Sequence, residues 1–223
     1  MLDGLTMPEP FAELPRNAFA AISADPPWRF RTWSDTNQKK SARRYYDLMT
    51  TEDVCALPVA DLATDNCVLF LWAVNPMLPQ ALRVMEAWGF TYKTIAFTWA
   101  KTTTRTDASW APKWHIGLGY YTRANTETCL LGVRGSPKRV SKDVRQLLIS
   151  PRREHSRKPD EFFSSVERLV PGPYLDLFSR QARPGWTAWG NEATKFNKVT
   201  PEQPLRRRDP SDAQALTGMS EFP

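Results

Sequence analysis

An acidic residue, two prolines and a tryptophan stand side by side at Asp25, Pro26, Pro27 and Trp28, directly after a short apolar run. The ionised Asp25 side chain accepts hydrogen bonds, and each proline lacks an N–H group and has a fixed φ, so that the carbonyl groups point in set directions. Trp28 adds a flat apolar ring. The four residues therefore predict a rigid set of acceptors beside a stacking surface, which suits a planar ring that carries an –NH2 group.

The chemistry that such acceptors favour is attack by an aromatic amine on an electrophilic carbon. The lone pair of such an amine is delocalised into the ring, which makes the nitrogen a poor nucleophile. Hydrogen bonds from both N–H groups, one to Asp25 and one to a proline carbonyl, favour a pyramidal nitrogen with a localised lone pair. The same acceptors stabilise the positive charge that develops when a methyl group is attacked in line. We therefore expect methyl transfer to the exocyclic amine of a base.

The elements that must position Asp25 are expected to alternate between strands and helices. Apolar or alternating stretches predict strands at 19–24, 67–73, 91–101, 126–135, 174–179 and 186–190. Helical spacing of apolar residues and capping signals predict helices at 50–57, 76–90 and 158–170. Such alternation predicts an α/β fold with a mostly parallel sheet and helices on both faces. Ligand sites in these sheets lie outside the carboxyl ends of the strands, and Asp25 directly follows the first expected strand.

Two of the expected helices have apolar residues on one side. In the helix at 76–90 these residues are Leu78, Leu82, Met85 and Trp88, and Gly89 ends it. In the helix at 158–170 they are Phe162, Phe163, Val166 and Leu169. Both sets are predicted to face the core.

The length and composition predict a single domain. With 223 residues and 41% hydrophobic content, the chain has enough apolar material for one core. We expect this domain at 1–192, with an irregular lead-in at 1–17. A disordered basic tail is expected to follow at 193–223.

The chain is basic, with 30 lysines and arginines against 24 acidic residues and a net charge of +6. Positive charge favours a polyanionic partner such as nucleic acid. Two polar and basic stretches, 29–44 and 136–157, are expected to form loops at the same end of the sheet and to line a phosphate-binding groove there. Candidate substrate contacts in these stretches are Arg31, Lys39, Lys40, Arg43, Lys138 and Arg139. General solubility is the alternative explanation of the basic surface.

Several classes of protein are disfavoured by the rest of the sequence. The three cysteines form no CxxC pair and there are only two histidines, so we expect neither a disulfide framework nor a metal site. No apolar run approaches the length of a membrane span, and the N-terminus has no secretory pattern. We therefore expect a soluble, cytoplasmic protein.

The stretch at 25–28 resembles the DPPW motif of the MT-A70 family of adenine-N6 methyltransferases. Further segments resemble that family in the family's order, over about residues 19–192: LFLWAVN at 69–75, GFTYKTIAFTWAKT at 89–102, TETCLLGVRG at 126–135, RKPDEFFSSVERLVPG at 157–172, YLDLFSR at 174–180 and GWTAWGNE at 185–192. The resemblance implies a Rossmann-like methyltransferase fold with S-adenosylmethionine as methyl donor. It also implies a permuted motif order, in which the catalytic strand precedes the main cofactor-binding strand.

The resemblance also implies roles for individual residues. Residues 25–28 would hold the target adenine and form the catalytic motif, and Tyr46 resembles a gating tyrosine in the loop that follows. The residues that match cofactor contacts of the family are Lys158 at the cofactor carboxylate, Asp176 and Arg180 near its ribose, and Asn191 with Glu192, a pair that the family usually has as Asn-Gln.

Two departures from the family pattern concern the cofactor site. Ser179 stands where many members have glycine, and the stretch 181–184 is short and lacks a His-Asn pair. Plainer explanations also stay open for two candidates, since Lys158 is also explained as a solvated residue at the start of a helix and Tyr46 by surface packing. Asp176 lies within an apolar strand, where a carboxylate needs partners, and this favours a ligand role.

The expected substrate is adenine in DNA, because the chain is compact and resembles bacterial or phage members of the family. The same reaction on RNA is one alternative. Another is a catalytically silent nucleic-acid-binding partner of a methyltransferase, although such members have usually lost the motif that is intact here. Methylation of a cytosine amine is a third, but related enzymes commonly begin the motif with serine, so Asp25 favours adenine. Some relatives work in pairs, so a homodimer is also considered.

Overall fold

The computed structural model describes residues 10–29, 48–103, 113–117, 119–154 and 157–196. In chain order its elements are β1 (Phe19–Ala24), α1 (Thr51–Cys55), the 3₁₀ helix η3 (Val59–Asp61), β2 (Ala63–Ala73), the 3₁₀ helix η4 (Asn75–Met77), α2 (Leu78–Ala87), β3 (Thr91–Thr102), β4 (Thr126–Arg134), β5 (Leu147–Pro151), α3 (Asp160–Leu169), β6 (Tyr174–Leu177) and β7 (Trp186–Trp189). Of these, β5 and η3 are additional to the elements predicted from the sequence, and the helix predicted at 76–90 is formed by η4 and α2.

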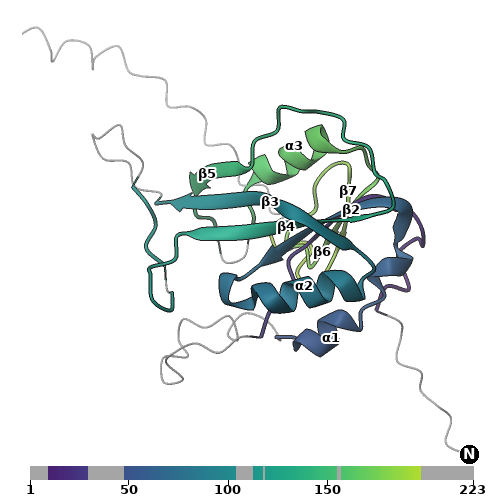
Figure 1. The fold of residues 1–223 in the computed structure, drawn as a ribbon, viewed down its shortest axis with the longest axis horizontal. Helices are drawn as coiled ribbons and strands as arrows, with labels where there is room; N and C mark the ends of the chain where they lie inside the picture. Colours follow the sequence, from purple (N-terminus) through teal and green to yellow (C-terminus); the bar gives the residue numbers. More distant parts are fainter. Residues whose placement is uncertain (1–9, 30–47, 104–112, 118, 155–156, 197–223) are drawn as a thin grey trace, which may run out of the picture.

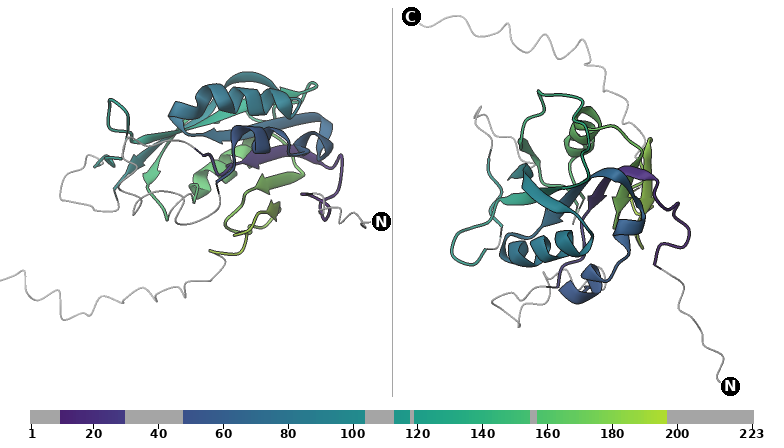
Figure 2. Two further views of the ribbon diagram at one scale, coloured as in Figure 1. Left: turned by 90° about the horizontal axis from the view of Figure 1, so that it is seen from below. Right: turned by 45° about the vertical axis from the view of Figure 1, so that its right-hand side comes forward.

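The strands form one seven-stranded sheet in the order β5-β3-β4-β2-β1-β6-β7 (Figure 1). β4 runs antiparallel to its neighbours β2 and β3, and every other pairing is parallel. All strands except β4 therefore point the same way, and their carboxyl ends lie along one edge of the sheet. Helices α1 and α2 cover one face and α3 covers the other (Figures 1 and 2). The mostly parallel α/β fold with helices on both faces is confirmed.

The two faces of the sheet are packed by alternate residues of the same strands. On β2, Leu69 and Leu71 pack into the core beneath α1 and α2, whereas Phe70 and Trp72 pack on the opposite face. There the Trp72 ring makes an edge-to-face contact with Phe162 of α3, at a centroid distance of 5.0 Å. Because successive side chains of a strand point to opposite faces, a strand that is covered on both faces is apolar throughout.

Helix α2 differs from the prediction at one position. Leu82, which was expected to face inward, is 42% exposed. The buried residues of this helix are Ala81, Val84 and Met85. Leu82 lies one residue, about 100° of rotation, away from Ala81, which places it outside this buried stripe. Trp88 is buried as expected, and its indole N–H donates to the Val54 carbonyl at 2.9 Å, which joins α2 to α1.

Strand β5 lies inside the basic stretch 136–157, for which the sequence predicts a loop. It pairs in parallel with β3, and its residues alternate, with Leu148 and Ser150 buried but Leu147 and Ile149 exposed. The stretch leaves β4 at the edge of the sheet opposite Asp25 and reaches the carboxyl edge only at the end of β5. It therefore runs along the whole length of the sheet, and the expectation of a loop at the Asp25 end is wrong for its first half.

The described chain continues a few residues beyond the predicted domain boundary at 192. The backbone N–H of Phe196 donates to the carbonyl of Arg180 at 3.2 Å, so residues 193–196 pack against the end of β6. The rest of the predicted tail, 197–223, lies outside the described residues. Within the described parts of the chain, no helix is long and apolar enough to cross a membrane.

Candidate active site

The end of β1 places Asp25 at the carboxyl edge of the sheet, between β2 and β6. Ala24 pairs with Leu71 on one side and Leu177 on the other. The turn that follows is fixed by backbone hydrogen bonds, since the Trp28 N–H donates to the Pro26 carbonyl at 2.8 Å and the Met49 N–H donates to the Pro27 carbonyl at 3.0 Å. A carbonyl oxygen has two lone pairs, so each proline carbonyl keeps a second acceptor position.

The sequence predicts an open Trp28 ring, but in the structure this ring is buried. Trp28 is only 4% exposed and packs in the core with residues of α1 and α2. Its indole N–H donates to the carbonyl of Trp72 at 3.0 Å, at the end of β2. A buried indole that satisfies its N–H in this way anchors the turn after Asp25, and it does not present a free face for stacking.

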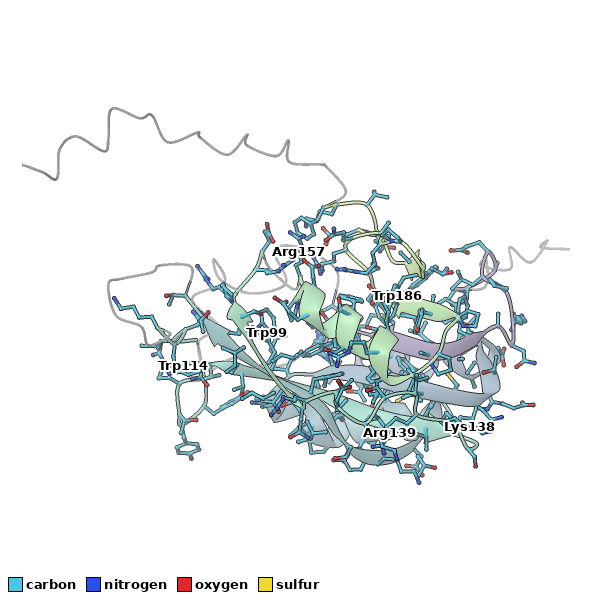
Figure 3. All side chains as sticks on the ribbon, turned by 90° about the horizontal axis from the view of Figure 1, so that it is seen from above. Trp99, Trp114, Lys138, Arg139, Arg157 and Trp186 are labelled. Atoms are coloured by element: carbon cyan, nitrogen blue, oxygen red, sulfur yellow. The ribbon has the colours of Figure 1, made fainter. Side chains whose placement is uncertain are left out.

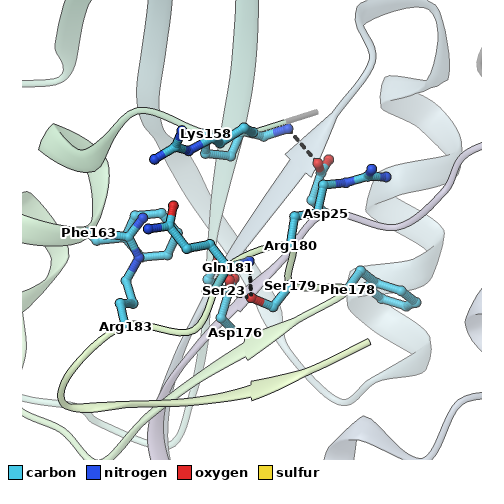
Figure 4. A pocket seen from close by; sticks show the side chains of 11 residues that line it. Ser23, Asp25, Lys158, Phe163, Asp176, Phe178, Ser179, Arg180, Gln181 and Arg183 are labelled. Atoms are coloured by element: carbon cyan, nitrogen blue, oxygen red, sulfur yellow. Dashed lines mark hydrogen bonds and ion pairs between the residues drawn. The ribbon is translucent and has the colours of Figure 1, made fainter. Parts of the chain in front are cut away.

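Lys158 reaches Asp25 from the opposite side of the site, directly before α3 (Figure 4). Its ammonium lies 2.5 Å from Oδ2 of Asp25 and 3.2 Å from Oε2 of Glu127, and 5.0 Å from the centre of the Trp72 ring. The Lys158 side chain is only 8% exposed. A positive charge at the start of a helix is unfavourable toward the helix dipole, and these two carboxylates explain why it is tolerated here.

Glu127 is a site residue that the sequence analysis does not single out. It lies at the start of β4, where its second oxygen forms an ion pair with Lys101 of β3. Charges of alternating sign therefore run from Asp25 through Lys158 and Glu127 to Lys101. The available signal was a lone carboxylate at the start of the expected strand TETCLLG, which is the same kind of signal that pointed to Asp176.

The pKa values in this chain of charges follow from burial and from the neighbouring charges. Burial alone would lower the pKa of Lys158, but the Asp25 and Glu127 carboxylates outweigh it and raise that pKa. Burial likewise opposes ionisation of Glu127, but Lys158 and Lys101 lower its pKa to about 2. For Asp25 burial prevails and raises the pKa, with the Glu127 carboxylate adding to the effect and Lys158 opposing it. Lys158 and Glu127 therefore carry full charges at neutral pH.

Asp176 lies on the neighbouring strand β6, opposite Ser23 of β1 in the register of the two strands. It is 8% exposed, and burial raises its pKa to about 6. Hydrogen bonds from the Ser179 and Ser23 side chains and the charge of Arg183 oppose that rise. Ser179, which replaces the glycine of many relatives, thus contributes a hydroxyl to this carboxylate.

An open pocket adjoins these carboxylates (Figure 4). It is lined by Ser23, Asp25, Arg157, Lys158, Phe163, Asp176, Phe178, Ser179, Arg180, Gln181 and Arg183. Four of the predicted site residues, Asp25, Lys158, Asp176 and Arg180, therefore meet at one cavity. Gln181 and Arg183 occupy the stretch that lacks the His-Asn pair of relatives, so this stretch still supplies polar side chains to the pocket.

The lining of the pocket suits a polar ligand that carries both signs of charge. Among the described residues, buried side-chain atoms of Arg157, Gln181 and Arg183 have no hydrogen-bond partner: Nε of the two arginines and Oε1 of the glutamine. Buried polar atoms without partners are costly in a folded protein, and a bound ligand is one means of satisfying them after small side-chain movements. The described part of the chain holds no cluster of three or more metal-ligating side chains.

The predicted pair Asn191 and Glu192 lies farther from the cavity. Glu192 forms an ion pair with Arg180, whereas Asn191 is exposed, and neither residue lines the pocket. Gly190 precedes them at φ 151°, where a Cβ atom would come within 3.0 Å of the Phe178 backbone. Glu192 therefore supports the pocket wall through Arg180 in this conformation, whereas Asn191 makes no such contact among the described residues.

The predicted nucleic-acid contacts are not brought together at the site. Lys138 and Arg139 are exposed but lie at the other end of the molecule from Trp99, Trp114 and Arg157 (Figure 3). They follow β4, whose antiparallel direction carries its end away from Asp25. They are therefore not part of a groove around Asp25. The remaining substrate candidates, Arg31, Lys39, Lys40, Arg43 and Tyr46, lie outside the described residues.

Comparison with known proteins identifies relatives along most of the chain. Residues 19–192 match the family model described as MT-A70. The chain is 31% identical over 202 residues to the type II methyltransferase M.MunI of Mycoplasma sp, with 82% of each protein covered. It is 30% identical over 219 residues to an N(6)-adenosine-methyltransferase MT-A70-like protein of Arabidopsis thaliana, and 26% identical over 193 residues to the N(6)-adenosine-methyltransferase catalytic subunit METTL3 of Homo sapiens. The chain spans only 29% and 30% of the length of these last two proteins.

Proposed function

The chain belongs to the MT-A70 family of methyltransferases, and from this we propose that it transfers a methyl group from S-adenosylmethionine to the N6 amine of adenine in DNA. The observation that carries the proposal is the position of Asp25. Asp25 directly follows β1 at the carboxyl edge of the sheet. Its side-chain carboxylate is held by Lys158 and borders the polar pocket. An acceptor that can meet an incoming amine thus lies beside a cavity for a methyl donor.

The pocket residues fit S-adenosylmethionine by their charge. The donor carries a carboxylate, an amine, a ribose and a positively charged sulfur. We assign Lys158 and Arg157 to its carboxylate and Asp176 to its amine or ribose hydroxyls, because Lys158 and Asp176 are the buried cation and the buried carboxylate of the lining and Arg157 adjoins Lys158 in it. When bound, S-adenosylmethionine would supply the electrophilic methyl group.

Asp25 would act on the amine of the target base. Its carboxylate accepts one N–H of the amine, and the free lone pair of a proline carbonyl in the turn accepts the other. These acceptors stabilise the positive charge that the nitrogen gains as it attacks. Lys158 orients the carboxylate, and the Trp28 ring, anchored at Trp72, holds the turn that presents it.

Two considerations support DNA over RNA as the substrate. The relative that matches this chain in length is a type II methyltransferase, a term used for DNA-modifying enzymes. The relatives named for adenosine are more than three times as long as the part that matches. The chain carries a net positive charge, which suits any polynucleotide. Adenine in a duplex must leave the stack to reach Asp25, which costs a few kcal/mol.

The experiment offers methyl-labelled S-adenosylmethionine to the purified protein with unmethylated duplex DNA of random sequence, matched single-stranded DNA and matched RNA. Nucleosides are then analysed by mass spectrometry. We expect N6-methyladenine in DNA with the native protein and about 10²–10³-fold slower formation with the Asp25→Asn variant. N6-methyladenine confined to RNA would overturn the proposed substrate. The absence of both a methylated base and cofactor binding would favour the silent binding partner instead.

Two further features of the proposal concern the protein as a whole. We place it in the cytoplasm with its nucleic acid as partner, and we consider that two copies associate. Cell fractionation tests the location, and light scattering with and without DNA tests the association.

A further inference from the structure

We propose that residues 113–117 and 119–125, the described part of the connection between β3 and β4, form a nucleic-acid contact surface. Aromatic side chains on this surface would stack on nucleotides next to the target adenine. The inference rests on the proposed function, because it assumes that the substrate is a polynucleotide. It adds a binding surface that is separate from the methyl-donor pocket.

Large apolar side chains are exposed on this connection. Trp114 is 46% exposed, Ile116 67%, Tyr120 46% and Tyr121 98%. A single exposed ring on a protein surface needs no explanation, but four large apolar side chains within one short connection indicate a contact surface. Tyr121 in particular buries almost nothing, so its ring does little for the stability of this chain.

The connection is folded despite this exposure. Thr102 and Trp114 form an isolated antiparallel bridge, and the backbone N–H of His115 donates to the Lys101 carbonyl at 2.9 Å. Farther along, the N–H of Gly117 donates to the Ala124 carbonyl at 2.8 Å. These bonds join the connection to the end of β3 and join its own two halves to each other. The exposed rings therefore lie on a segment with a defined backbone conformation.

The positive charge of this surface favours a polyanionic ligand over a protein partner of average charge. Residues 113–125 include Lys113 and Arg123 but no aspartate or glutamate. Arg152 borders the same place, since its backbone N–H donates to the Thr102 carbonyl at 3.0 Å. Aromatic rings interleaved with basic side chains are the pattern by which proteins hold unpaired nucleotides, with the rings stacking on bases and the cations pairing with phosphates.

The connection is continuous with the catalytic residues. It begins after Thr102, the last residue of β3, and the preceding Lys101 pairs through its ammonium with Glu127, which in turn contacts Lys158, the partner of Asp25. Trp114 lies at the same end of the molecule as Trp99 and Arg157 (Figure 3). A strand that delivers its adenine to Asp25 would therefore pass over this surface with its neighbouring nucleotides.

The test compares single ring removals on this surface with a matched removal elsewhere. Trp114→Ala and Tyr121→Ala remove rings from the connection, and Tyr121→Phe keeps the ring. Tyr92→Ala is the control, because Tyr92 is 43% exposed but starts β3 at the opposite end of the sheet. Affinity for fluorescently labelled random-sequence DNA, single-stranded and duplex, is measured by anisotropy, together with cofactor affinity and sedimentation.

We expect each ring removal to weaken binding of single-stranded DNA about five- to a hundredfold, the effect of losing one stacked base. Tyr121→Phe and Tyr92→Ala should bind as the native protein does, and cofactor affinity should be unchanged throughout. Native affinity in Trp114→Ala and Tyr121→Ala would overturn the inference. A change in sedimentation with unchanged DNA binding would also overturn it, and would assign the surface to a protein partner. Failure of the proposed function is seen separately, as a native protein that methylates no adenine.

Discussion

Asp25, which is half-buried, and Asp176, which is buried, are carboxylates at the same edge of the sheet, and their charges are compensated in different ways. Asp25 has the Lys158 ammonium 2.5 Å away, in a chain of alternating charges that continues to Glu127 and Lys101. Asp176, on the adjoining strand, has the hydroxyls of two serines as its hydrogen-bond partners, and its pKa is about 6. One carboxylate is paired within the protein, whereas the other titrates close to neutral pH.

The difference indicates what each carboxylate is for. A carboxylate paired with a buried lysine keeps its position before any ligand arrives, which suits a group that must orient an amine during the reaction. Asp176 has neutral hydroxyls as hydrogen-bond partners, and the charge of Arg183 only partly offsets the effect of burial on its pKa. Such a buried carboxylate destabilises the unliganded protein, and a ligand that completes its contacts explains why it is there. We therefore assign Asp25 to the methyl-transfer step and Asp176 to cofactor binding.

The largest effect is expected from Lys158→Met, which removes the charge but keeps a long side chain. Asp25 and Glu127 would then face each other with no ammonium between them. Breaking a buried ion pair costs about 3–5 kcal/mol of stability. Urea unfolding at neutral pH measures this loss, and methyl transfer should also fail. The double variant with Glu127→Gln should regain part of the stability, and a single variant as stable as the native protein would contradict the role of the charge.

Asp25→Asn should come next, with its effect on the reaction rather than on binding. The amide keeps the shape of the carboxylate but loses its charge, and Lys158 still has Glu127 as a partner. Loss of one group that stabilises developing charge lowers kcat about 10²–10³-fold. The cofactor Kd should stay near that of the native protein. A variant that weakened cofactor binding without slowing single-turnover methyl transfer would reverse the assignment of the two carboxylates.

Asp176→Asn should stabilise the protein at neutral pH, whereas Lys158→Met destabilises it. The pKa of Asp176 is raised from 3.8 to about 6 in the folded protein, so the folded state holds its proton more tightly than the unfolded state. The contribution of Asp176 to the free energy of unfolding therefore falls as pH rises from 4 to 6, and it is lowest above pH 6. The variant removes a penalty on the order of 3 kcal/mol at neutral pH, and none at acidic pH, while weakening cofactor binding.

Thermal unfolding of native protein and Asp176→Asn at a series of pH values checks this expectation. The variant should unfold at the higher temperature near neutral pH, and the two curves should converge toward pH 4. Ser179→Gly sharpens the test, since loss of the hydroxyl should raise the pKa of Asp176 further and steepen the pH dependence. A constant difference at every pH would show that packing, and not the charge, is responsible.

The smallest effect is expected from Glu127→Gln. The two lysines lower the pKa of Glu127 from 4.5 to about 2, so its ionised form stabilises the fold above pH 4.5 and this contribution is lost as pH falls toward 2. Replacing it should cost about 1–3 kcal/mol near neutral pH. Urea unfolding at neutral and at acidic pH should show a deficit that shrinks in acid. An equal deficit at both would mean that Glu127 acts only through packing.

Much of the fold was predictable because its signals are local. The apolar run at 19–24 is β1 residue for residue, and Thr50 caps α1 through a reciprocal hydrogen-bond pair with Asp53. β5 was not predictable by the same means, since its five residues alternate inside a strongly basic stretch. Leu82 was misplaced because two apolar residues on neighbouring positions of α2 compete for one buried stripe, and composition alone does not say which one wins.

The site shows the same division. Asp25 and Lys158 stood out singly, each by its neighbours in the chain. The burial of Trp28 did not follow from its motif, because the acceptor for its indole N–H is the carbonyl of Trp72 on another strand. The distance of Lys138 and Arg139 from Asp25 did not follow either, because it depends on the antiparallel direction of β4, and side-chain patterns do not encode strand direction.

By itself the sequence determined the alternation of strands and helices, the position of Asp25 at a strand end and the types of charged residue available to a site. Those features depend on neighbours within a few positions of the chain. Only the tertiary structure decided which charges meet, since Asp25 and Lys158 are 133 residues apart and their contact exists only where β1 and the start of α3 converge. The physical reason is that an ion pair acts over a few ångströms and gains strength from burial, and both the distance and the burial are properties of the packed fold.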